Sequence, residues 1–78
     1  MSNAINDLFT DDQYCYDEIN RIRGEVFCKI GATQAQWKAA FDTLAKMYLH
    51  CSENLKTTVL SQIHEGQTRE IMVAFALD

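Results

Sequence analysis

The chain has 78 residues, of which 47% are hydrophobic and 23% are charged, with three glycines and no proline. This composition is typical of one globular domain over residues 1–78, and a chain of this length buries only about 60–65% of its unfolded surface, which leaves little room for a deep catalytic pocket. The net charge of −4 divides into −5 over residues 1–18 (five acids, no Lys or Arg) and +1 over residues 19–78 (six acids, seven bases). An acidic chain without a basic cluster lacks the usual footprint for phosphate backbones or anionic lipid, so neither nucleic acid nor a membrane is expected as a partner.

Targeting signals and cysteine spacing place further limits on function. No stretch reaches the roughly 18 apolar residues of a membrane span, and the N-terminus lacks the basic and apolar regions of a secretory signal, which together predict a cytoplasmic protein. The cysteines, Cys15, Cys28 and Cys51, are odd in number and show no C-x-x-C spacing. We therefore expect reduced, partly buried thiols and neither a disulfide framework nor a metal or cofactor.

The first predicted element is a helix over about residues 11–30, preceded by a flexible or extended segment, 1–9. Thr10 or Asp11 can cap this helix, and acids in its first turn offset the positive end of the helix dipole. Apolar residues then recur at steps of three or four, as in one face of a helix: Cys15, Ile19, Ile22, Val26 and Ile30. Gly24 weakens this helix, so a short strand over 25–30 remains an alternative.

A second helix is expected to begin after Gly31, because Thr33 and Gln36 fit a capping box. An apolar stripe then runs from Trp37 through Phe41, Leu44, Tyr48 and Cys51 to Leu55, and Val59 and Ile63 extend it. If unbroken, a helix over 34–65 would be about 48 Å long and would project past the core of its own chain. Alternatively, Ser52 caps a new helix and the rod divides into 34–50 and 53–65; the unbroken stripe favours continuity.

The last predicted element lies after Gly66, which has the character of a residue that ends a helix. Residues 71–77 are all apolar. We predict a separate helix over 68–77, with a strand over 70–77 paired to 25–30 as the alternative. The expected fold is therefore all-α, a hairpin or bundle of three to four helices, and the alternative is α+β.

No catalytic motif is recognisable in the sequence. It contains no phosphate-binding loop, dinucleotide fingerprint, nucleophile elbow or zinc-protease signature. His50 and His64 would lie about 21 Å apart on one straight helix, too far to share a metal. His50 and Cys51 are adjacent and would point in different directions on a helix, so they do not form a catalytic pair. We expect a protein that is not an enzyme.

The window from residue 26 to 40 resembles a helix-turn-helix in part, with a turn glycine at Gly31 and a second helix opened by Thr33. The resemblance implies a dimeric DNA-binding regulator whose second helix reads bases with Thr33, Gln34, Gln36 and Lys38. Phe27 departs from the pattern, because it stands where such motifs need a very small residue. The same residues make an ordinary helical hairpin, so DNA binding is the alternative function.

The leading hypothesis concerns the start of the first helix, where two tyrosines alternate with carboxylates. Such a surface combines apolar anchors with a charged rim and suits a basic protein surface. The residues are Asp11, Asp12, Tyr14, Tyr16, Asp17 and Glu18. We predict a non-catalytic interaction module, a small regulator or inhibitor of the kind bacteria and phages encode, that binds a larger protein target.

A homodimer is also expected, because residues 71–77 and the far end of the apolar stripe present more apolar surface than the first helix can cover. A second subunit is the simplest cover for that surface. The predicted dimer interface consists of Tyr48, Leu55, Val59, Ile63, Ile71 and Phe75.

Overall fold

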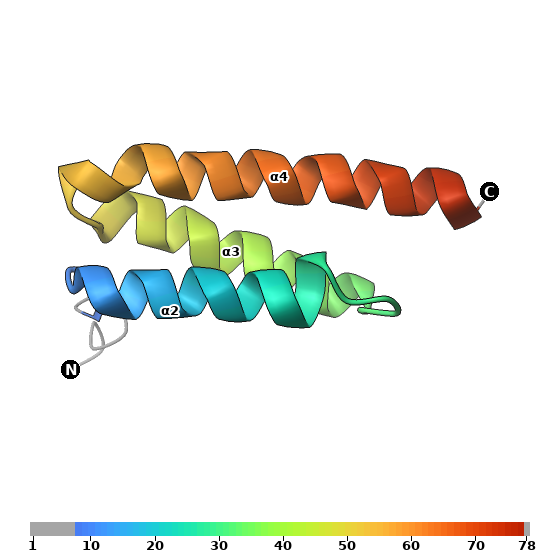
Figure 1. Cartoon of the computed structure of the whole chain (residues 1–78), viewed down its shortest axis with the longest axis horizontal. Coiled ribbons are helices and arrows are strands. Elements are labelled where there is room, and N and C mark those ends of the chain that lie inside the picture. The colour runs from blue at the N-terminus through green and yellow to red at the C-terminus, as the bar shows by residue number, and fades with distance from the viewer. Residues whose placement is uncertain (1–7, 78) are drawn as a thin grey trace.

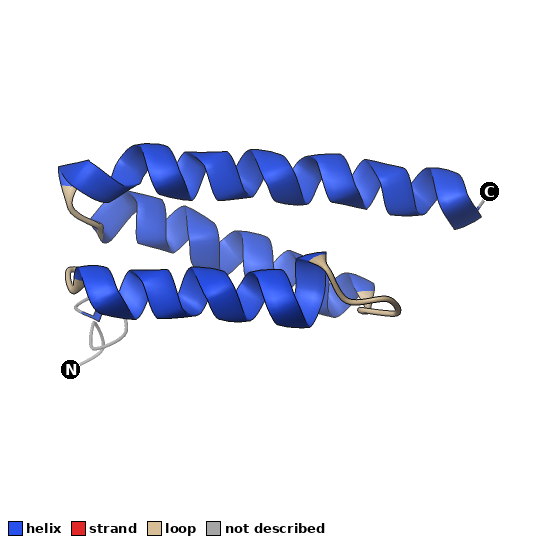
Figure 2. Ribbon diagram, in the orientation of Figure 1, coloured by secondary structure: helices blue, strands red, loops and turns tan. Residues whose placement is uncertain are grey.

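A computed structural model describes the backbone of residues 8–77 and the side chains of residues 8–74. Its elements are α2 (Asp12–Ile22), the π-helical turn η1 (Arg23–Phe27), α3 (Gln34–His50) and α4 (Glu53–Leu77). The all-α prediction is confirmed. The described part of the chain holds no strand (Figure 2), so the alternative with strands over 25–30 and 70–77 is wrong.

The three helices lie along one axis. Helices α2 and α4 run in the same direction, and α3 runs opposite to both (Figure 1). The molecule measures 42 × 25 × 17 Å. One continuous core fills the space between the helices, and its buried members are Phe9, Cys15, Ile19, Ile22, Val26, Phe27, Trp37, Ala40, Leu44, Met47, Cys51, Leu55 and Val59. Phe9 lies within this core, which corrects the expectation of a flexible 1–9 at that residue; residues 1–7 lie outside the described part.

Helix α2 begins as the sequence predicted but ends earlier. Asp11 is its cap, and the Asp11 carboxylate accepts hydrogen bonds from the backbone N–H groups of Gln13, at 2.9 Å, and Tyr14, at 3.4 Å. The apolar stripe faces the core down to Val26. The helix then closes in η1, and Ile30, expected on the same stripe, is 98% exposed in the loop that follows.

Phe27, the last residue of η1, is the point where the three helices meet. Its ring stacks on Trp37 at 5.3 Å between centroids and lies 5.6 Å from the Phe41 ring. On its other side it contacts Gly66 so closely that a Cβ atom there would lie 2.4 Å from the Phe27 ring. Gly66 is therefore a packing residue, which allows α4 to approach the end of η1.

Helix α3 begins with the predicted capping box. The Thr33 hydroxyl accepts from the Gln36 N–H at 3.1 Å, and the Thr33 N–H donates to the Gln36 side chain at 2.8 Å. The helix ends at His50 because Cys51 is extended (φ −76°, ψ 168°). The prediction of a continuous helix over 34–65 is thus wrong, and the alternative with a break near Ser52 is correct. Folding the rod back lets Leu55 and Val59 complete the core of their own chain.

Helix α4 does not end at Gly66, and the separate helix predicted over 68–77 is its continuation. Arg69 bonds to Glu65 one turn before it across this position, at 3.2 Å. At 1.5 Å per residue, the 25 residues of α4 span about 38 Å and the 17 of α3 about 26 Å. The C-terminal turns of α4 therefore extend past the bundle (Figure 1).

Candidate functional site

Four of the eight exposed large hydrophobic side chains in residues 8–74 belong to the loop after η1 and to the last turns of α4, at one end of the long axis; the others are Leu8, Tyr16, Leu49 and Leu60. At this end the loop between η1 and α3 turns, and the last turns of α4 project beyond it (Figure 2). The exposed fractions are 98% for Ile30, 58% for Ile71, 64% for Met72 and 45% for Val73. We call these four residues the apolar end. The consecutive residues 71–73 form an exposed apolar patch, and such patches mark interaction sites in small proteins.

Val73 shows why this surface is uncovered. Val59, Gly66 and Val73 are seven residues apart, so they lie on one face of α4. Val59 is fully buried and Gly66 packs on Phe27. Val73 continues the same face beyond the end of η1, and without a neighbouring helix it stays 45% exposed. The core-facing side of α4 therefore extends past the core.

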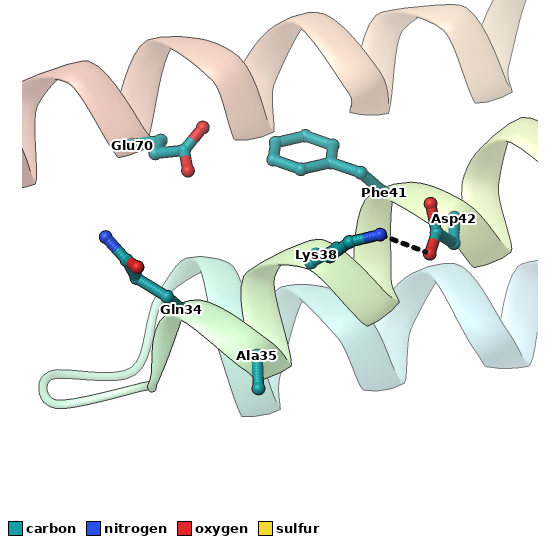
Figure 3. Close-up of a pocket in the computed structure, with 6 residues that line it drawn as sticks. All are labelled: Gln34, Ala35, Lys38, Phe41, Asp42 and Glu70. Atoms are coloured by element: carbon teal, nitrogen blue, oxygen red, sulfur yellow. Dashed lines mark ion pairs between the residues drawn. The ribbon is translucent and has the colours of Figure 1, made fainter.

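A groove lies beside the apolar end, between the start of α3 and the C-terminal half of α4. Its volume is about 630 Å³ (Figure 3). The half-buried Phe41 ring forms its apolar part, and polar side chains stand around it. Lys38 and Asp42 form an ion pair at 3.7 Å on the α3 side, and Glu70 stands on the α4 side. The remaining lining residues are Gln34 and Ala35.

The carboxylates of the predicted acidic face take part in the fold. Asp11 caps α2, and Asp12 accepts a hydrogen bond from the Ser52 hydroxyl at 3.0 Å. Asp17 accepts from the Gln13 amide at 3.0 Å, and Glu18 pairs with Arg21 at 2.8 Å. Because α2 and α4 both begin at this end of the molecule, two positive helix ends meet there, and acids offset them. The local acidity thus has a structural role.

The two tyrosines of that face do not form one anchor. Residues two apart on a helix point about 200° from one another, almost to opposite sides. Tyr14 is half-buried, with its ring 5.8 Å from that of Phe9, whereas Tyr16 is 45% exposed on the other flank. The structure therefore separates the two apolar groups on which the predicted binding surface depends.

The residues of the helix-turn-helix hypothesis are divided in the same way. Thr33 and Gln36 satisfy each other in the capping box. Gln34 and Lys38 are exposed, but they line the groove together with the carboxylates of Asp42 and Glu70. Negative side chains beside Lys38 oppose the approach of a phosphate backbone.

The predicted dimer residues differ in how far they are exposed. Leu55 and Val59 are 1% and 0% exposed within the single chain, so neither is accessible to a second copy. Tyr48 and Ile63 are partly buried against the core. Ile71 is exposed at the apolar end, and the side chain of Phe75 lies outside the described residues. Met72 and Val73 belong to the predicted apolar run; Ile30 at the apolar end was missed, because its spacing fits the core stripe.

The three cysteines differ in burial. Cys15 is fully buried and its Sγ donates to the Phe9 carbonyl oxygen at 3.1 Å. Burial, together with the nearby Cys51, raises the pKa of the Cys15 thiol to about 11, so it is protonated near neutral pH. Cys28 is exposed and Cys51 is buried. Among residues 8–74, no group of three His, Cys, Asp or Glu side chains is arranged to hold a metal ion.

No protein-family model, curated protein or solved structure matches the chain. Within residues 8–77, no helix combines the length and the hydrophobicity that crossing a bilayer would require.

Proposed function

We propose that this chain is a non-catalytic protein-interaction module that binds its partner through the apolar end. The observation that carries the proposal is the exposure of Ile71, Met72 and Val73 on a helix that runs past its own bundle. Each Å² of apolar surface left in water costs about 25 cal/mol relative to burial. A 78-residue domain has little stability to lose in this way, so a partner that covers the surface brings a direct gain.

The shape of the surface agrees with one mode of recognition. An amphipathic helix that lies in an apolar groove is read through side chains spaced three and four residues apart. The end of α4 provides an exposed helix that is apolar on most of its sides, and the groove at Phe41 provides a concave surface beside it. The acidic start of α2, whose carboxylates are engaged within the fold, is the weaker candidate.

An affinity capture with paired variants tests the proposal. The tagged wild type is compared with Ile71→Lys/Met72→Lys at the apolar end and with the matched control Tyr16→Lys/Asp17→Lys at the acidic end. Every retained protein is scored, including untagged copies of the chain. All four positions are exposed in the structure, so each variant is expected to keep the fold.

We expect retained proteins to be lost with the apolar-end variant and kept with the acidic-end variant. The reverse pattern would overturn the proposal in favour of the acidic face. Retention of nothing above a tag-only background would contradict an interaction module altogether. Circular dichroism of both variants confirms that a loss of binding does not reflect unfolding.

A further inference from the structure

A projecting helix and a groove lie at the same end of the molecule. The last turns of α4 project at the same end of the long axis at which the groove between α3 and α4 opens (Figures 1 and 3). A surface that contains a projection and a hollow can pair with itself about a two-fold axis. We propose that the occupant of the apolar end is a second copy of this chain, with the end of each α4 seated in the groove of the other. This inference rests on the proposed function and names its partner.

The distribution of apolar side chains on α4 favours a groove as the partner surface. Successive helical residues point about 100° apart, so Ile71, Met72 and Val73 together face most of the circumference. All three are exposed. A flat partner surface would cover one side of such a helix, whereas a groove between two helices covers more than one. The groove that contains Phe41 has this form.

Charge favours a second copy over an oppositely charged partner. Residues 71–77 carry no charged side chain, so an acidic or basic partner would gain little there. The acidic start of α2 lies at the opposite end of a 42 Å molecule, several Debye lengths away at physiological salt (about 8 Å). Two copies of a chain with net charge −4 therefore meet with little repulsion when they meet through this end.

The groove rim is also self-complementary. Glu70 immediately precedes the apolar run, so it arrives at the rim of the opposite groove when the partner receives that run. On the α3 side of the rim the positively charged side chain is Lys38, which is 79% exposed and lies 3.7 Å from Asp42 of its own chain. A two-fold axis thus forms the Glu70–Lys38 contact twice, once from each copy.

A charge swap between Lys38 and Glu70 tests the arrangement. We expect the wild type to give twice its 8.9 kDa mass by light scattering coupled to size exclusion at micromolar concentration. Lys38→Glu alone and Glu70→Lys alone each place like charges across both contacts, so each is expected to dimerise about tenfold more weakly. An equimolar mixture of the two variants restores both contacts and should recover wild-type affinity as a heterodimer. An effect within one chain cannot produce this recovery.

Matched controls are Lys46→Glu and Asp17→Lys, which make the same charge changes at exposed positions that do not line the groove. Both should dimerise as the wild type does.

A mass of 8.9 kDa at every concentration, or a mixture that fails to recover dimerisation, would overturn the inference. If the chain is monomeric and the variant Ile71→Lys/Met72→Lys still abolishes capture of another protein, the proposed function stands. The partner at the apolar end is then that protein and not a second copy. Co-sedimentation of the wild type with phosphatidylglycerol vesicles would assign the surface to a membrane and overturn both.

Discussion

Gly66 determines how closely α4 can approach η1. In the interior of a helix, replacing glycine with alanine normally stabilises a protein by about 0.5–1 kcal/mol, because alanine loses less backbone entropy on folding. At position 66 the added Cβ atom would lie 2.4–2.9 Å from three atoms of the Phe27 ring. That ring is only 3% exposed and is held between Trp37 and Phe41, so it has little space in which to move.

We therefore expect Gly66→Ala to lower the free energy of unfolding by about 1–3 kcal/mol, the usual cost of overpacking a core. Gly24→Ala is the matched control, since a Cβ atom there meets nothing within 4 Å. The control should leave stability unchanged or raise it. Urea denaturation of the two variants gives the comparison, and equal stability of the two would contradict the packing role of Gly66.

Burial of Cys15 has a consequence at high pH. Its folded pKa, about 11, lies above its ordinary value of 9.0, so the folded state holds the thiol proton more tightly than the unfolded state does. The stability from this difference is fully present below pH 9 and is lost as pH rises towards 11. Between pH 8 and 10.5 the loss amounts to about 2 kcal/mol. Cys15→Ala should lose correspondingly less stability over that range in urea titrations under reducing conditions; equal losses in wild type and variant would disprove the assignment.

For single residues, the sequence predicts structure well where the interacting residues are close together in the chain. The Asp11 cap and the Thr33–Gln36 capping box form between residues two or three positions apart, and both are present. Gly66 was assigned to a helix end because glycine commonly ends helices. Its actual role depends on Phe27, 39 positions earlier in the chain, and sequence spacing alone does not reveal such a contact.

The turn between α3 and α4 shows, for whole helices, that sequence spacing alone does not determine which residues come together. The apolar stripe continues through residues 51–55 at helical spacing, and this pattern fits one long rod or two antiparallel helices equally well, since both bury the same positions. The hairpin forms because it covers Leu55 and Val59 within one chain. Ser52 adds a link from the turn to α2, through its 3.0 Å hydrogen bond to Asp12.

Lys56 stabilises this hairpin from the first turns of α4. Its ammonium group donates to the Tyr48 carbonyl at 2.6 Å, near the end of α3, and lies 4.8 Å from the centre of the Tyr48 ring. Carbonyl groups in the last turn of a helix lack partners within the helix. We expect Lys56→Met to cost about 1–2 kcal/mol of unfolding free energy in urea titrations. Lys46→Met, on an exposed face of α3, should cost less than about 0.5 kcal/mol; an equal cost for both would show that the contact contributes nothing.

The whole molecule is polarised in charge, with acids where α2 and α4 begin and an uncharged segment, 71–77, where α4 ends. The sequence predicted an excess of apolar surface in residues 71–77, and the structure places Ile71, Met72 and Val73 in solvent. The sequence also assigned Leu55 and Val59 to that surface, whereas both are buried within the single chain. Leu55 was expected at the dimer interface and is buried in the core, whereas Ile30 was expected in the core and is exposed. This exchange arose because the burial of both residues depends on where the chain turns.

This exchange gives a prediction for the stability of the single chain. Leu55→Ala should lower the free energy of unfolding by about 2–5 kcal/mol, as for other fully buried leucines. Ile71→Ala, at a position 58% exposed, should change it by less than about 0.5 kcal/mol when measured at a dilution that keeps the chain monomeric. Similar losses for the two would mean that residue 71 is covered within the monomer.

Amide hydrogen exchange of the wild-type chain, followed at micromolar and at near-millimolar concentration, tests most directly whether the end of α4 is an interface between two copies of the chain. In the single chain, the last turns of α4 extend past the bundle and should exchange faster than residues 53–66. At the higher concentration we expect slower exchange in two segments only, the end of α4 and the start of α3 around the groove. Slower exchange confined to the start of α2, or rates in α4 that do not change with concentration, would contradict the pairing of two copies through this end.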